Sequence, residues 1–250
     1  MTETVVDLSW EGPTAVVTMA DTVGRNTFSP ELSGGLVAAV EAAAAEPRTR
    51  VVLVEGLPEL FCAGGRQAEL LDFAKGRGSF DEDDFFRIFL RCPLPVVAAV
   101  QGHAIGGGLV MALYADLLVL SERSIYTANF MRYGFTPGMG ATHVLPAKLG
   151  ALLGQEMLYT GRNYRGAELR RRGAPPSIVA HSEVPRTARE LASTVAQAPR
   201  GSLELLKKET AAPLAERTES AIARETEMHR VSFHLPEVHE RISTSYGGAR

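Results

Sequence analysis

Residues 102–113 (GHAIGGGLVMAL) constrain the fold more than any other stretch of the chain. They follow the apolar run 95–100 (PVVAAV), which is typical of a strand buried on both faces. Three glycines, Gly106 to Gly108, then open an apolar helix. Glycine lets the backbone approach a ligand with no Cβ in the way, and the first N–H groups of a helix have no acceptor within it. The pattern therefore predicts a main-chain site for an oxyanion.

A second stretch has the same design. Residues 60–66 (LFCAGGR) form a small-residue turn after the apolar strand predicted over 51–55 (VVLVE). Two such strand-to-turn units, each offering a backbone N–H, can hold one carbonyl oxygen from both sides. The sequence thus predicts an oxyanion hole built from two loops.

The order of the predicted elements indicates the α/β class. A hairpin is predicted over 5–19, and a Ser29-Pro30 helix start predicts a helix to Ala45. Further strand-then-helix units follow, and the C-terminal part is helical, with an interruption expected at Pro213. Strands that alternate with helices are typical of α/β folds.

Composition limits the classes of function. The 250 residues suit one or at most two domains, and a net charge of −3 implies no broad basic surface for nucleic acid. We expect no secretion leader and no membrane span, because no apolar run approaches the ~20 residues that cross a bilayer. Cys62 and Cys92 are expected to be free thiols in a reducing cytoplasm, and the His and Cys spacing suggests no metal site.

These stretches together resemble the crotonase (enoyl-CoA hydratase/isomerase) superfamily. The resemblance implies a spiral of ββα turns over residues 1–198 and a C-terminal helical trimerisation region over 199–250. It also implies that the N–H groups of Gly65 and Gly107 are the paired oxyanion donors. The motifs that carry it occur in the family's order, at 25–32 (RNTFSPEL), 61–65 (FCAGG), 102–108 (GHAIGGG), 134–140 (GFTPGMG), 160–162 (TGR) and 233–237 (FHLPE).

Two acids of the family's hydratases are missing here. The hydratases use two glutamates to handle water, and the matching positions hold Val110 and Phe130. Neither side chain can transfer a proton, so the addition of water to a double bond has no visible base. We expect the two side chains to form a dry wall beside the substrate.

A smaller set of motifs resembles the decarboxylating members of polyketide β-branching cassettes, namely 64–67 (GGRQ), 70–76 (LLDFAKG) and 232–237 (SFHLPE). The resemblance implies that a 3-methylglutaconyl-type thioester on an acyl carrier protein loses CO2 and gives a 3-methylcrotonyl-type thioester. It implies that Lys75 and His234 are the polar catalytic residues. Arg66 and Gln67 either line the substrate site or begin a helix. No metal and no redox cofactor are implied. The substrate is carried on the phosphopantetheine of an acyl carrier protein or of CoA.

Several alternatives stay open. The chain could be a CoA-dependent enoyl hydratase or double-bond isomerase, or a non-catalytic member that binds a carrier protein. Lys75 could be a solvated loop lysine and His234 a surface imidazole. The run Arg170 to Arg172 could be a solvated helix end or a carrier contact. Trimer or dimer of trimers, carrier protein or CoA, the proton donor and the final double-bond position are likewise open.

Overall fold

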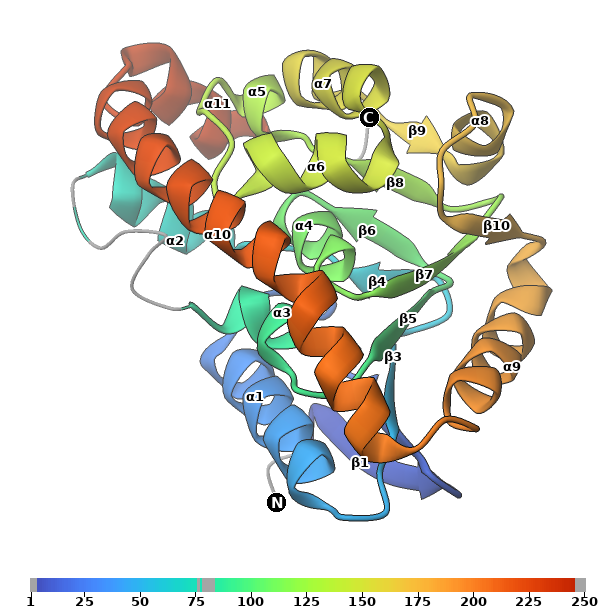
Figure 1. The fold of residues 1–250 in the computed structure, drawn as a ribbon. Helices are drawn as coiled ribbons and strands as arrows, with labels where there is room; N and C mark the ends of the chain where they lie inside the picture. The colour runs from blue at the N-terminus through green and yellow to red at the C-terminus, as the bar shows by residue number, and fades with distance from the viewer. Residues whose placement is uncertain (1–3, 76, 78–83, 246–250) are drawn as a thin grey trace.

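The computed structural model describes residues 4–75, 77 and 84–245, and it has the predicted α/β architecture. Its centre is a six-stranded sheet (Figure 1). The strand order is β1 (Val6–Glu11), β2 (Thr14–Met19), β3 (Val51–Glu55), β5 (Val96–Val100), β7 (Leu117–Ser121) and β10 (Ser177–Val179). The first pair is the predicted hairpin and is antiparallel, whereas the other neighbouring pairs of this sheet are parallel.

A smaller sheet lies beside the first. Its order is β4 (Leu60–Cys62), β6 (His103–Ile105), β8 (Ile125–Thr127) and β9 (Tyr164–Arg165). Strands β4, β6 and β8 follow β3, β5 and β7 in the chain, and they lead into α2 (Gln67–Ala74), α4 (Gly107–Leu113) and α5 (Phe130–Tyr133). Each of these three turns of the chain therefore gives one strand to each sheet and then a helix, which confirms the expected spiral.

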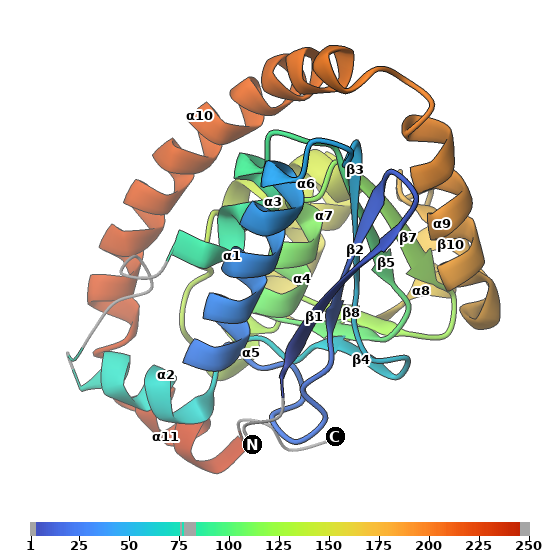
Figure 2. The same ribbon diagram turned by 90° about the horizontal axis from the view of Figure 1, so that it is seen from below.

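The central strands are apolar because both faces of the large sheet are covered. On one face, Val51 and Leu53 pack with α9 (Val184–Val195), and on the other Val52 and Val54 belong to the main core. Figure 2 shows α9 and α1 (Pro30–Ala45) on opposite sides of the sheet. Parallel strands buried on both faces are expected to be continuous apolar runs, as they are here.

Helix α10 (Arg200–Ser232) is a single helix of 33 residues along the outside of the molecule (Figures 1 and 2). The predicted interruption at Pro213 is therefore wrong. Pro213 and Glu209 are exposed, so the Glu209 carbonyl that loses its helical partner can be hydrated instead. After α10, the short helix α11 (Pro236–Ser245) packs on α2, where Gln67 Nε2 donates to Ile242 O (2.7 Å). The domain boundary at residues 198 and 199 stays a prediction.

Several shorter helical segments complete the fold. The helix predicted over 164–172 is instead the short strand β9 followed by a helix that begins at Gly166. No helix in the described ranges is both long and apolar enough to span a membrane. The segments are η1 (Asp84–Arg87), α3 (Ile88–Arg91), α6 (Ala141–Leu149), α7 (Ala151–Thr160), α8 (Gly166–Arg171) and η2 (His181–Glu183).

Candidate active site

The first glycine loop follows β4 and is fixed against the start of α1. Gly64 has a φ of +78°, and its carbonyl accepts the N–H of Phe28 (2.9 Å). A Cβ at Gly64 would lie 2.6 Å from the carbonyl oxygen of Ile105 and 3.1 Å from the amide nitrogen of Gly107. Only glycine fits there, and the two loops predicted to form one oxyanion hole are in direct contact.

The second loop begins α4. Gly106 has a φ of +55° and donates its N–H to Thr127 O (2.8 Å), which ties the loop to β8. A Cβ at Gly107 would lie 2.6 Å from the Phe28 ring and 2.9 Å from Met139 Sδ. Gly107 is therefore enclosed by side chains. The roles of Gly65 and Gly107 as paired donors stay predictions, but the backbone brings their loops together.

The positions of the two missing acids are apolar and buried. Val110 lies in α4 with 0% exposure, and Phe130 begins α5 with 5% exposure. The Phe130 ring meets Phe135 edge-on (6.0 Å between centroids), and Phe135 stacks on Phe233 (4.9 Å). This aromatic chain connects the predicted dry wall to the C-terminal end of α10.

Lys75 and His234 lie at the ends of two helices. Lys75 is the C-cap residue of α2, and its backbone N–H donates to the carbonyls of Leu71 and Asp72. His234 follows α10, and its backbone N–H donates to Val231 O (3.2 Å). Both side chains are exposed. Their segments meet, because Phe73 and Phe233 make an edge-to-face contact (6.1 Å). Their catalytic roles stay predictions.

Arg66 and Gln67 begin α2, as one of the two interpretations expected. Arg66 Nε donates to Glu69 (3.1 Å), and Gln67 ties α2 to α11 through Ile242. Their predicted contact with substrate is not tested by these contacts, so it stays a prediction.

The thiol of Cys62 lies in the first glycine loop but is not placed as a nucleophile. Cys62 is fully buried and its Sγ donates to Asn26 O (2.9 Å). Burial raises the pKa of this thiol to about 12, so it is neutral near pH 7. Cys62 and Cys92 are both free, as predicted.

Glu225, His229 and Ser232 on α10 were missed by sequence reasoning as residues near the site. His229 Nε2 donates to Thr136 O (3.0 Å), within the glycine-proline turn 134–140. These contacts join positions more than 80 residues apart, so no local motif announces them. The only signal is their spacing of four and three residues on one helix face.

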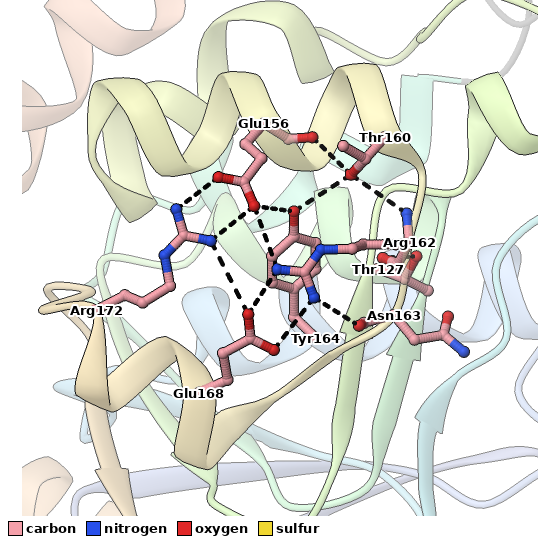
Figure 3. A network of polar contacts seen from close by, with 8 residues as sticks. All are labelled: Thr127, Glu156, Thr160, Arg162, Asn163, Tyr164, Glu168 and Arg172. Atoms are coloured by element: carbon pink, nitrogen blue, oxygen red, sulfur yellow. Dashed lines mark hydrogen bonds and ion pairs between the residues drawn. The ribbon is translucent and has the colours of Figure 1, made fainter.

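Two arginines of the run at 170–172, Arg170 and Arg172, form ion pairs with glutamates. Figure 3 shows Arg172 on Glu156 (2.6 Å), whose carboxylate also accepts from Tyr164 (2.9 Å). Hydrogen bonds from Arg172 and Tyr164 lower the pKa of Glu156 to about 2. Arg170 pairs with Glu122. The contacts of these two arginines favour the interpretation as a helix end.

No cluster of three or more His, Cys, Asp or Glu side chains able to hold a metal occurs among the described residues.

Comparisons of sequence and of fold identify relatives of this chain. Residues 11–245 match the sequence profile described as enoyl-CoA hydratase/isomerase. The chain is 44% identical over 248 residues to the bacillaene synthase decarboxylase PksI of Bacillus subtilis, covering 99% of this chain and 100% of the relative. A solved structure from a dehydratase/decarboxylase enzyme couple of polyketide β-branching superposes with a TM-score of 0.95 at 44% identity, covering 98% and 100% of the two chains.

The ECH2 decarboxylase domain of CurF from Lyngbya majuscula superposes with a TM-score of 0.93 at 39% identity, covering 96% of this chain and 99% of the domain. These comparisons confirm both levels of the resemblance expected from the sequence.

Proposed function

This chain belongs to the enoyl-CoA hydratase/isomerase family, and on that premise we propose that it is a decarboxylase of polyketide β-branching. Its substrate is a 3-methylglutaconyl-type thioester on an acyl carrier protein, and its product is a 3-methylcrotonyl-type thioester. The observation that carries the proposal is the contact of the two glycine loops beside an apolar wall where the hydratases place acids. Gly64 and Gly107 mark that contact, and Val110 and Phe130 stand at the two acid positions.

The first step breaks the bond between the substrate's γ-carbon and its carboxylate. CO2 leaves, and the electron pair remains in the substrate as a dienolate with negative charge on the thioester oxygen. The N–H groups of Gly65 and Gly107 stabilise that charge. Loss of one such donor costs about 3–4 kcal/mol in the barrier.

An apolar wall favours this step. The starting carboxylate has a concentrated charge that water stabilises well, whereas the dienolate spreads its charge over several atoms. Val110 and Phe130 exclude water, so the charge is easier to disperse than it would be in a wet pocket. The same wall provides no base to activate water for addition to a double bond.

Lys75 and His234 supply the polar chemistry in this proposal. They bind the departing carboxylate, and one of them then donates a proton to a carbon of the dienolate. The contact between Phe73 and Phe233 supports the pairing, since it joins the two segments that carry these side chains. Arg66 and Gln67 complete the substrate side at the start of α2.

The proposed surroundings follow from the same resemblance. The acyl carrier protein is the partner, the enzyme is a homotrimer or a dimer of trimers, and it acts in the cytoplasm. The reaction is redox-neutral because the electrons of the broken bond stay in the substrate, so the chemistry needs no redox cofactor.

Intact mass spectrometry of the carrier tests the function. The protein is incubated with 3-methylglutaconyl-carrier protein, and in a parallel reaction with crotonyl-CoA. We expect the carrier to lose the mass of one CO2 and the crotonyl-CoA to remain unhydrated. Hydration of crotonyl-CoA without loss of CO2 would instead establish a hydratase, and carrier binding without turnover of either thioester would indicate a non-catalytic member.

A further inference from the structure

One face of the second half of α10 holds the glycine-proline turn that follows α5. Glu225, His229 and Ser232 lie on this face at spacings of four and three residues. His229 bonds to Thr136 O (3.0 Å), and Ser232 Oγ accepts from Thr136 N (3.3 Å). The turn 134–140 is therefore fixed by a helix that begins some 60 residues later in the chain.

Glu225 makes the most concentrated of these contacts. Its carboxylate is 1% exposed and accepts from the N–H of Gly140 (2.7 Å), the N–H of Thr142 (2.8 Å) and the hydroxyl of Thr142 (2.6 Å). Gly140 is the N-cap residue of α6 and has no side chain to cap that helix, so Glu225 caps it from outside. A negative charge at a helix N-terminus is also favoured by the helix dipole.

The residue before Gly140 connects this cap to the oxyanion loop. Met139 has a φ of +64°, which is uncommon for a residue with a side chain, and Gly140 follows at +78°. The hydroxyl of Tyr114 donates to Met139 O (2.5 Å). The thioether of Met139 lies 2.9 Å from the position that a Cβ on Gly107 would occupy. A shift of the Gly140 backbone would therefore move the side chain that packs on Gly107.

We propose that Glu225 is a positioning residue for the reaction: by capping α6 it holds Met139 against Gly107 and fixes the C-terminal end of α10, which His234 follows, relative to the oxyanion loops. The proposal rests on the proposed function for its chemistry. It assigns to α10 a second task beside placing His234, which follows its C-terminal end. Burial raises the pKa of Glu225, while its hydrogen bonds to Thr142 and Gly140 favour the ionised form that can accept all three bonds.

The experiment compares Glu225→Gln with a control on the same helix. Gln keeps the size of the side chain but replaces one acceptor oxygen with an NH2 group that faces a backbone donor. Lys207→Met breaks another buried anchor of α10, in which Lys207 Nζ donates to both oxygens of Asp116 (2.9 and 2.7 Å), about five helical turns earlier. Thr142→Val removes only the hydroxyl bond to Glu225, and Thr142→Ser keeps it.

We expect Glu225→Gln to lower kcat roughly tenfold with little change in KM, as for a change of about 1.4 kcal/mol in the barrier. Thr142→Val should show a smaller loss of kcat, whereas Thr142→Ser should keep the wild-type kcat. Lys207→Met should lower the Tm at least as much as Glu225→Gln while leaving kcat unchanged. Wild-type activity alone tests the proposed function, and the ratio of variant to wild type, on whichever thioester the wild type turns over, tests Glu225.

Hydrogen exchange gives a readout that needs no turnover. The two variants are compared under conditions that give them the same global free energy of unfolding. Backbone amides of 134–142 and 106–108 should then exchange faster in Glu225→Gln than in Lys207→Met. Equal exchange in the two variants, or a kcat in Glu225→Gln that matches the wild type, would overturn the proposal. So would a loss of kcat in Lys207→Met as large as that in Glu225→Gln.

Discussion

The two glycine loops are buried or half-buried main chain, whereas Lys75 and His234 are exposed side chains at the ends of two helices. The loops are held by strand pairing and by steric limits at Gly64 and Gly107. The helix ends are held by side-chain contacts, among them the rings of Phe73 and Phe233, the Gln67 bond to α11 and the bonds of α10 to the turn 134–140. Under the proposed function, the stabilisation of the enolate is a task of the backbone, whereas the choice of reaction is a task of side chains at the helix ends.

The largest expected effect comes from disrupting the contact between the two glycine loops. In Gly64→Ala the new Cβ meets Ile105 O at 2.6 Å and displaces the backbone at Gly107, so we expect kcat to fall about 10²–10³-fold. The rate of CO2 loss from the carrier-bound thioester measures it. Gly173→Ala is the matched control, since Gly173 also has a positive φ (+74°) but no atom within 4 Å of its Cβ position. An equal loss in both variants would show that backbone strain alone is responsible.

The next largest effect is expected at the exposed side chains of Lys75 and His234. Lys75→Ala and His234→Ala should each lower kcat about 100-fold, because each removes a group that binds the carboxylate or transfers the proton. Arg77→Ala replaces an exposed cationic residue close to Lys75 in sequence, and His239→Ala replaces an exposed histidine close to His234. Both variants should retain the wild-type rate. Wild-type rates in both Lys75→Ala and His234→Ala would remove these residues from the mechanism.

A smaller effect is expected at the apolar wall. Val110→Thr keeps the shape of the side chain but adds a hydroxyl, and we expect kcat to fall roughly tenfold, a change of about 1.4 kcal/mol. Val110→Ala, which creates a cavity without a polar group, separates polarity from packing. If the two variants lose activity equally, dryness of the wall does not control the rate.

The smallest effect is expected at Cys62. Burial raises its pKa to about 12, so almost no thiolate is available near neutrality. Cys62→Ala should therefore leave kcat unchanged, and iodoacetamide should not label Cys62 in the folded protein at pH 8. Rapid labelling with loss of activity would contradict this description of the loop.

The two glycine loops could be predicted from the sequence because glycines, strands and turns are local signals. The loops at 61–65 and 102–108 and the start of α1 at Ser29 and Pro30 were identified in this way. The contacts of Glu225 and His229 could not, since they join residues more than 80 positions apart. Pro213 misled the prediction because a helix break depends on whether the released carbonyl can reach solvent, which the sequence does not state.

In the proposed reaction, an enolate-like anion forms between the two glycine loops as CO2 leaves. The most direct test is the intact mass of the carrier after turnover of 3-methylglutaconyl-carrier protein in D2O. We predict that the acyl group loses one CO2 and gains one carbon-bound deuterium from the quenched dienolate. An acyl group that keeps its carboxylate, or that gains the mass of water, would contradict the account.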